Sequence, residues 1–255
     1  MKTKVNILLD GRSLADIDPR IILQDVKELK PATKNTGVSL AGRIGQLVTI
    51  QDRTTLSVQV TFVIACKRDE IEDRARIIQR INAWAAQGGR LALSYRPGQH
   101  LDVVCDELPE AGDLRKFDAT YTIKLTAYDV PYWVDDRTSS ASGMGTVRMV
   151  VPGTARTPLE LETLASSAVN ALAVTDGRQL MEFDFGAAMP AGSILRIRHD
   201  GMIMVGTIEL PDGSTINALE YRTPESNDEL WLSPGTRELT VTGSTATLIV
   251  RGRWH

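Results

Sequence analysis

The chain has 255 residues, of which 42% are hydrophobic and 24% charged, so it can bury a sizeable core and wholesale disorder is excluded. Its 29 basic and 32 acidic residues nearly balance, which argues against a basic field that binds nucleic acid and against a polybasic membrane anchor. No apolar run approaches the roughly 18 residues of a membrane span, and the start, MKTKVNILLDG, is too short in apolar residues for a signal peptide.

Alternating apolar and polar residues predict two long strands in the first part of the chain. Over residues 54–66 apolar side chains recur at every second position, which is typical of a half-buried strand, and residues 118–130 show the same period. Shorter strands are expected at 90–95 and 101–106. The glycine-containing stretch 33–47 has few core residues, so we expect either an ordinary surface loop or an arm that reaches a neighbouring molecule.

One helix is expected in this part, at about residues 69–87. Asp69 is the predicted cap, with Glu72 three positions later, and Gly88-Gly89 is expected to end the helix. The apolar positions that recur at helical spacing are Ile71, Ala75, Ile78, Ile81 and Ala85. The first part therefore reads as a β-rich domain with one packed α-helix.

The two cysteines, Cys66 and Cys105, lie 39 positions apart with no metal-ligand spacing around either. We expect reduced, buried thiols in a protein made in the cytoplasm, and a single disulfide is the alternative.

A change in composition predicts a domain boundary near residue 145. All eight lysines occur up to Lys124, and the basic residues after position 146 are all arginine. Residues 135–145 are small and polar with two glycines, as expected of an exposed linker. The sequence therefore predicts two domains, 1–145 and 146–255.

The second part reads as strands throughout. Three Asp-Gly pairs mark tight turns, at Asp176-Gly177, Asp200-Gly201 and Asp212-Gly213. The expected strands are 147–151, 157–164, 170–175, 180–185, 194–199, 202–210, 215–221, 230–232, 237–242 and 245–253. Short strands at this spacing with no helical pattern indicate an antiparallel β-sandwich or jelly roll.

The search for catalytic chemistry finds no recognisable motif. The three histidines, His100, His199 and His255, are scattered, and no zinc, nucleotide or nucleophile motif is present. We therefore expect no catalytic, cofactor-binding or metal-ligating residues and no cofactor.

Two pairs of carboxylates deserve a test against glycoside hydrolysis. Glu182 and Asp184 lie on one strand face and partly resemble the ExDxxE signature of laminarinase-like hydrolases, but Ala187 stands where the third carboxylate is expected. A solvated face over a Phe core is the better interpretation, and the same holds for Glu160 and Glu162.

The four tryptophans are too dispersed to predict a sugar-stacking platform. They are Trp84, Trp133, Trp231 and Trp254. Scattered tryptophans in β proteins more often anchor cores or interfaces than stack against a sugar ligand.

The order of segments in the first part is itself informative. A short strand ends in Asp10-Gly11-Arg12, the glycine-containing stretch 36–45 follows, and the long strand, the helix and Tyr95-Arg96-Pro97-Gly98 come next. The last long strand closes with the sequence Tyr-Asp-Val-Pro-Tyr-Trp at 128–133. This order resembles that of phage distal tail proteins, the Dit-like hubs of siphophage tail tips, and the closing sequence is the most telling element of the resemblance.

The second part is similar to the galectin-like or carbohydrate-module-like sandwich that ends these proteins. Trp231 to Leu239, then Gly243 and the final Arg251-Gly252-Arg253-Trp254, carry this likeness. The galectin sugar-binding motif of His, Asn, Arg and Trp is absent, so the likeness does not imply sugar binding.

The resemblance implies a structural virion component of a phage or prophage rather than an enzyme. Such proteins form a ring, typically a hexamer, that joins the tail tube to the tip or baseplate. The implied partners are other copies of the chain, the tail tube protein, a tail-associated hub protein and receptor-binding or baseplate proteins. The implied location is the virion tail tip, after synthesis in the bacterial cytoplasm. Two alternatives remain open: a carbohydrate-binding module that attaches to host polysaccharide, and a small glycanase.

Overall fold

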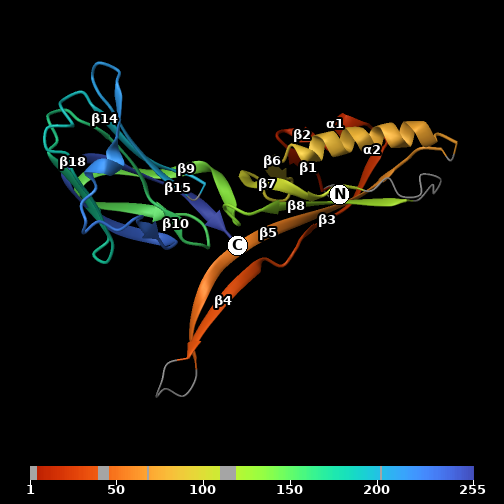
Figure 1. The fold of residues 1–255 in the computed structure, drawn as a ribbon, viewed down its shortest axis with the longest axis horizontal. Coiled ribbons are helices and arrows are strands. Elements are labelled where there is room, and N and C mark those ends of the chain that lie inside the picture. The colour runs from red at the N-terminus through yellow and green to blue at the C-terminus, as the bar shows by residue number, and fades with distance from the viewer. Residues whose placement is uncertain (1–4, 40–45, 68, 110–118, 202) are drawn as a thin grey trace. The chain divides into compact units, whose positions relative to one another are not determined.

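The computed structural model describes residues 5–39, 46–67, 69–109, 119–201 and 203–255, and for 33–39 and 46–52 it describes the backbone alone. The chain forms two compact units, Met1–Trp133 and Val134–His255 (Figure 1). The boundary thus lies before the position near residue 145 that the composition indicated.

The expected linker at 135–145 is wrong, because this segment belongs to strand β9 (Trp133–Val151). Small polar side chains occur both in exposed strands and in linkers, so the composition of this segment did not distinguish between the two. Ser142 and Thr247 share a hydrogen bond of 2.8 Å between their hydroxyls, and Asp135 Oδ1 accepts one of 2.7 Å from Trp254 Nε1.

The first unit is built on an antiparallel sheet in the order β3-β5-β8-β7-β6-β1-β2. Its elements are β1 (Ile7–Leu9), β2 (Arg12–Ser13), α1 (Leu14–Ile17), β3 (Ile21–Glu28), β4 (Ala32–Ser39), β5 (Gln46–Ile64), α2 (Ile71–Ala86), β6 (Gly89–Leu93), β7 (Gln99–Glu107) and β8 (Thr120–Ala127). The predicted period of two on β5 is confirmed, since the side chains of Leu56, Val58, Val60, Phe62 and Ile64 are all buried.

The predicted helix is confirmed as α2, although its start differs from the expectation. The N-cap is Glu70 rather than Asp69, and no side chain caps the helix. The chain leaves the helix through Gly88 at φ +61°, a conformation that glycine adopts without strain. Ile78, Ile81 and Ala85 of the expected stripe are buried, whereas Ile71 and Ala75 are only partly buried. The buried face is wider than expected, because it also includes Arg74, Ile77 and Trp84.

Helix α1 was not expected, because four residues are too few to show a helical period. Its signal is a capping box: Asp16 N donates to Ser13 Oγ, and Ser13 N donates to Asp16 Oδ2 at 2.7 Å. The Asp16 carboxylate accepts hydrogen bonds from the Ser13 backbone N–H and from the Ser13 hydroxyl, and these two bonds hold its pKa below the usual value.

The second unit is a mainly antiparallel β structure, as predicted. Besides β9 it contains β10 (Thr157–Pro158), β11 (Glu160–Leu164), β12 (Ala171–Thr175), β13 (Leu180–Asp184), β14 (Ile194–Asp200), β15 (Ile203–Glu209), β16 (Thr215–Asn217), the 3-10 helix η1 (Ala218–Tyr221), β17 (Trp231–Leu232) and β18 (Gly235–Trp254). The glycines of the three predicted Asp-Gly turns all have positive φ. The 3-10 helix replaces the end of the strand expected at 215–221.

Strand β18 joins two groups of strands around one core. Residues 240–242 pair with β12, and residues 247–249 pair with β11, which continues through β14 and β15 to β16. The buried residues of both groups, such as Val174 on β12 and Ile197 on β14, belong to the same hydrophobic cluster. This cluster spans residues 147–250, entirely within the second unit.

The fragment Val134–His255 is therefore expected to fold alone, with a single cooperative unfolding transition in urea followed by circular dichroism. A shorter fragment that begins at residue 147 keeps the buried cluster but loses the bond from Trp254 to Asp135, so it should unfold at lower urea. A non-cooperative transition in the longer fragment would contradict the division of the chain.

Candidate functional site

The first pair of carboxylates considered for glycoside hydrolysis makes structural contacts. On β13, Glu182 accepts a hydrogen bond of 3.0 Å from the Thr223 hydroxyl, and Asp184 is exposed. The intervening Phe183 stacks on Phe185 with ring centroids 5.7 Å apart, inside the core. The solvated strand face over a Phe core is thus what the structure contains.

The second pair, on β11, is engaged in the same way. Glu160 Oε1 accepts from the His199 backbone N–H at 3.2 Å, and Glu162 accepts from Arg196 Nε at 3.2 Å. His199 is buried, and this burial lowers its pKa to about 4. None of these four carboxylates lines the cavity of about 900 Å³ described below, and glycoside hydrolysis needs two carboxyl groups on either side of a bound sugar.

Over the parts of the chain that the structure describes, no three His, Cys, Asp or Glu side chains are arranged to hold a metal ion. None of the described helices has the length and apolar character needed to cross a membrane.

Cys66 and Cys105 are both free thiols, and burial raises the pKa of each. The alternative of a disulfide between them is therefore wrong.

The feature with the clearest capacity for interaction is a two-stranded ribbon, formed by β4 and residues 46–55 of β5. Ser39 pairs with Gln46 at its outer end and Ala32 with Thr55 at its base. In Figure 1 the ribbon extends away from the remainder of the first unit. Residues 40–45, which include Gly42 and Gly45 of the predicted arm, lie outside the described residues.

Both long edges of this ribbon lack a partner among the described strands. β4 pairs with β5 alone, and β8 reaches the opposite edge of β5 only from Leu56 onward. Unpaired strand edges present rows of backbone donors and acceptors that another strand can use. A two-stranded ribbon without further cover is at best marginally stable in water, so the ribbon is suited to pairing with another chain.

The base of the ribbon is fixed to the sheet by polar and aromatic contacts. The Thr54 hydroxyl donates to the carbonyl of Ala32 at 3.2 Å. The guanidinium of Arg53 lies over the ring of Tyr132, 5.6 Å from its centroid, and burial lowers the Arg53 pKa. The predicted Tyr-Trp ending of the first part thus helps to hold the ribbon.

Trp133 anchors the end of the same unit through Glu28. Arg96 donates to both carboxylate oxygens of Glu28 at 2.8 Å, and Trp133 Nε1 donates to Glu28 Oε2 at 3.0 Å. The Arg96 guanidinium also lies 5.0 Å from the centroid of the Trp133 ring. Burial opposes ionisation of Glu28, but these hydrogen bonds outweigh it, and the pKa of the carboxyl lies below its usual value.

Replacing Glu28 by Gln is expected to lower the free energy of unfolding by about 2 kcal/mol at pH 7, because Arg96 loses a two-pronged charged partner. The depressed pKa of Glu28 means that its contribution is present above the unfolded pKa and is lost as pH falls through the folded value. The variant and the native chain should therefore converge in acid. Urea unfolding at pH 7 and pH 3.5 measures this.

The matched control is Asp25→Asn on the same strand, where an exposed carboxylate faces Lys27 at 3.2 Å. Such a pair contributes less than about 1 kcal/mol. Equal losses in the two variants would show that the Glu28 cluster is not an anchor.

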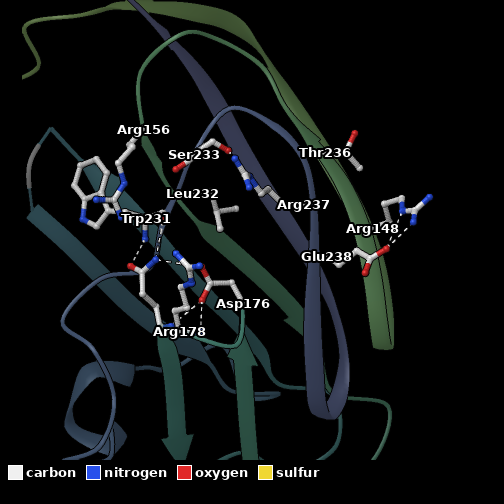
Figure 2. A pocket seen from close by; sticks show the side chains of 11 residues that line it. Arg148, Arg156, Asp176, Arg178, Trp231, Leu232, Ser233, Thr236, Arg237 and Glu238 are labelled. Carbon is white, nitrogen blue, oxygen red and sulfur yellow. Dashed lines mark hydrogen bonds and ion pairs between the residues drawn. The ribbon is translucent and has the colours of Figure 1, made fainter.

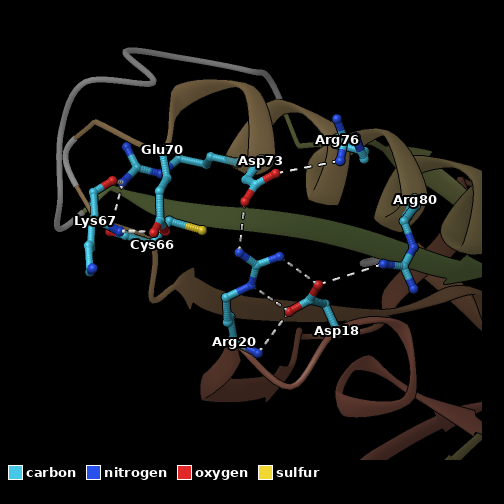
Figure 3. A network of polar contacts seen from close by, with 9 residues as sticks. Asp18, Arg20, Cys66, Lys67, Glu70, Asp73, Arg76 and Arg80 are labelled. Atoms are coloured by element: carbon cyan, nitrogen blue, oxygen red, sulfur yellow. Dashed lines mark hydrogen bonds and ion pairs between the residues drawn. The ribbon is translucent and has the colours of Figure 1, made fainter.

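A second polar network joins α1, β3 and α2 (Figure 3). Asp18 accepts from Arg20 Nε at 3.0 Å and lies 3.6 Å from Arg80 Nη1, while Arg20 Nη1 donates to Asp73 at 3.3 Å. The Arg20 hydrogen bonds hold the pKa of Asp18 below its usual value. By linking the end of α1 and the start of β3 to α2, the network holds the two helices in place relative to each other.

Comparison with solved structures shows that two phage proteins share this fold. The chain is similar to the Dit protein of phage SPP1, described as a paradigm of the hub adsorption apparatus of phages that infect Gram-positive bacteria: the TM-score is 0.73 at 14% identity, over 97% of this chain and 98% of that one. It is also similar to a chain of the phage P2 baseplate in its activated conformation, with a TM-score of 0.51 at 9% identity over 97% of each chain. No family model and no curated protein matches the sequence. The mainly β, Dit-like fold expected from the sequence is confirmed.

Proposed function

We propose that this protein is a structural component of a phage or prophage tail tip. The observation that carries the proposal is the similarity of fold to SPP1 Dit along 97% of the chain, across both units. A likeness confined to one sandwich would be compatible with many functions, because one fold hosts many. A likeness that includes both units, in the same order along the chain, is compatible with far fewer functions.

In this proposal six copies form a ring through the first unit, the ring-forming domain expected at 1–145. The second unit, the galectin-like sandwich expected at 146–255, faces the other tail proteins. The unpaired ribbon edges support the first part, because head-to-tail pairing of two different surfaces closes a ring when the rotation closes. The partners are the tail tube protein, a tail-associated hub protein and receptor-binding or baseplate proteins. The protein has no enzymatic role, and it acts in the virion tail tip after synthesis in the host cytoplasm.

Light scattering on the purified chain tests the ring. Six copies of a 27.9 kDa chain give a particle of about 170 kDa. Negative-stain electron microscopy of the same fraction should show a six-fold ring with a central channel. A monomer that persists up to about 100 μM and yields no rings would contradict the proposal, since ring closure by mass action is favoured at high concentration.

A further inference from the structure

The second unit contains a cavity of about 900 Å³ whose lining includes four arginines (Figure 2). Arg148 comes from β9, Arg156 from the segment before β10, Arg178 from the turn between β12 and β13, and Arg237 from β18. Only two carboxylates, those of Asp176 and Glu238, line it as well. The second unit as a whole has ten arginines and fifteen carboxylates, so it carries net negative charge. The lining of the cavity has the opposite sign, with four arginines and two carboxylates.

Two of these guanidiniums are held by neutral groups. Arg237 donates from Nε to the Ser233 carbonyl and from Nη2 to the Pro234 carbonyl, both at 2.8 Å. Arg156 Nη2 donates to the Trp231 carbonyl at 3.3 Å. Backbone carbonyls fix the position of a guanidinium but do not neutralise its charge, so both cations are oriented, and neither forms an ion pair with a residue that the structure describes.

The other two arginines differ in their partners. The guanidinium of Arg178 has no hydrogen bond or ion pair with any residue that the structure describes. Arg148 pairs with Glu238 at 2.6 Å, and both side chains are well exposed, so this pair can open at little cost. The Asp176 carboxylate is held by the backbone N–H groups of Arg178 and Gln179 at 2.9 and 2.7 Å and keeps its negative charge, so with Glu238 it leaves the lining with two more positive than negative side chains.

The cavity also has an aromatic wall, Trp231, which is held from two sides. The side-chain amide of Gln179 donates to the Trp231 carbonyl at 2.9 Å and accepts from its N–H at 3.0 Å. The guanidinium of Arg253 lies 5.0 Å from the centroid of the indole ring. Trp231 is only partly buried and lines the cavity, so its indole adds an apolar surface beside the charged groups.

We propose that this cavity binds an anionic saccharide, with a carboxylate or phosphodiester group held by Arg178, Arg156 and Arg237 and a sugar ring against Trp231. Guanidinium forks match the planar, two-oxygen geometry of these anions. A concave site of this volume suits a short saccharide, whereas an extended acidic peptide would use a strand edge or a flatter surface. This inference goes beyond the structural role proposed above and does not depend on ring formation.

Isothermal titration of the full chain at low salt tests it, with trigalacturonic acid as the carboxylate probe and a glycerol-phosphate oligomer as the phosphodiester probe. At least one of the two should bind, and which one binds identifies the anion. Maltotriose, the neutral probe, should bind at least about tenfold more weakly, and higher salt should weaken binding of the anionic probe.

Arg178→Ala removes no side-chain hydrogen bond within the described structure, so this variant should fold normally while its Kd for the anionic probe rises about tenfold. Arg198→Ala is the matched control, because Arg198 is an exposed arginine of the same unit outside the cavity, and it should change the Kd less than about twofold. No heat from either anionic saccharide at about 5 mM, or equal binding of maltotriose, would overturn the proposal. Tighter binding of triglutamate than of both saccharides would overturn it in favour of an acidic protein segment.

Discussion

A chain in which residues 36–49 are replaced by an Asn-Gly turn is expected to remain folded but to lose the ring, with its mass in light scattering falling from about 170 kDa to about 28 kDa. Asn35 and Ile50 lie opposite each other in the ladder, so a two-residue turn can close the shortened ribbon there. The pairing of β5 with β8, which begins at Leu56, and with β3, which begins at Val58, is left in place. The thermal midpoint should therefore change little.

The reason for the expected loss is the edge geometry of the ribbon. A neighbouring copy that pairs with either edge of the ribbon would satisfy backbone groups that have no partner in the described chain. Removing the ribbon removes this surface and leaves the second unit intact.

The matched control is the fragment Met1–Trp133, which keeps the ribbon and lacks the second unit. It should assemble into a particle of about 90 kDa, six times its own mass. The opposite pattern, in which the ring survives loss of residues 36–49 and dissociates without the second unit, would assign self-association to Val134–His255.

Gly243→Ala is expected to destabilise the second unit by more than about 3 kcal/mol, because it combines backbone strain with a steric clash. Gly243 has φ +94°, and a Cβ there would lie 2.0 Å from the carbonyl oxygen of Ala171. This oxygen belongs to backbone at the start of β12, which cannot move without disturbing the pairing of β12 with β13 and β18. Urea unfolding of Val134–His255 measures the loss.

Gly213→Ala is the control, since Gly213 has a similar φ of +83° and open space where a Cβ would be. That variant should lose only about 1 kcal/mol from strain. If both variants lost the same amount, the close approach at Gly243 would not be a structural constraint.

The special role of Gly243 follows from the side-chain pattern of β18. Before it, the buried positions are Leu239 and Val241, and after it they are Ala246, Leu248 and Val250. The inward-facing positions change from odd to even, as happens when a strand gains one residue relative to its pleat. The strands predicted at 237–242 and 245–253 are therefore both present, but they are two parts of the single strand β18. The first part pairs with β12 and the second with β11.

Local patterns in the sequence predicted the features that depend on residues close together in the chain. The period of two on β5 and the three Asp-Gly turns rest on short-range rules, and both were predicted from the sequence. The resemblance to distal tail proteins added the order of the domains, and the comparison of folds confirmed the overall class.

Features that depend on distant residues could not be predicted in this way. The Glu28–Trp133 bond joins positions 105 residues apart, and the four arginines of the cavity are spread from position 148 to 237. The strand order of the sheets decides which of these distant residues lie close together. Spacing along the sequence therefore does not predict such contacts. The unpaired edges of the ribbon are a further example, since whether a strand has a neighbour is a property of the whole sheet.

The continuity of β5 has a mechanical consequence. The same strand forms one side of the ribbon at its start and an inner strand of the sheet, between β3 and β8, at its end. Tension applied to the ribbon along this strand would act on all of its hydrogen bonds to β3 and β8 in parallel, as shear, instead of opening them one after another. Load on the ribbon would therefore be passed directly into a strand whose inward side chains, from Leu56 to Ile64, are buried in the core, with no loop between ribbon and sheet to yield.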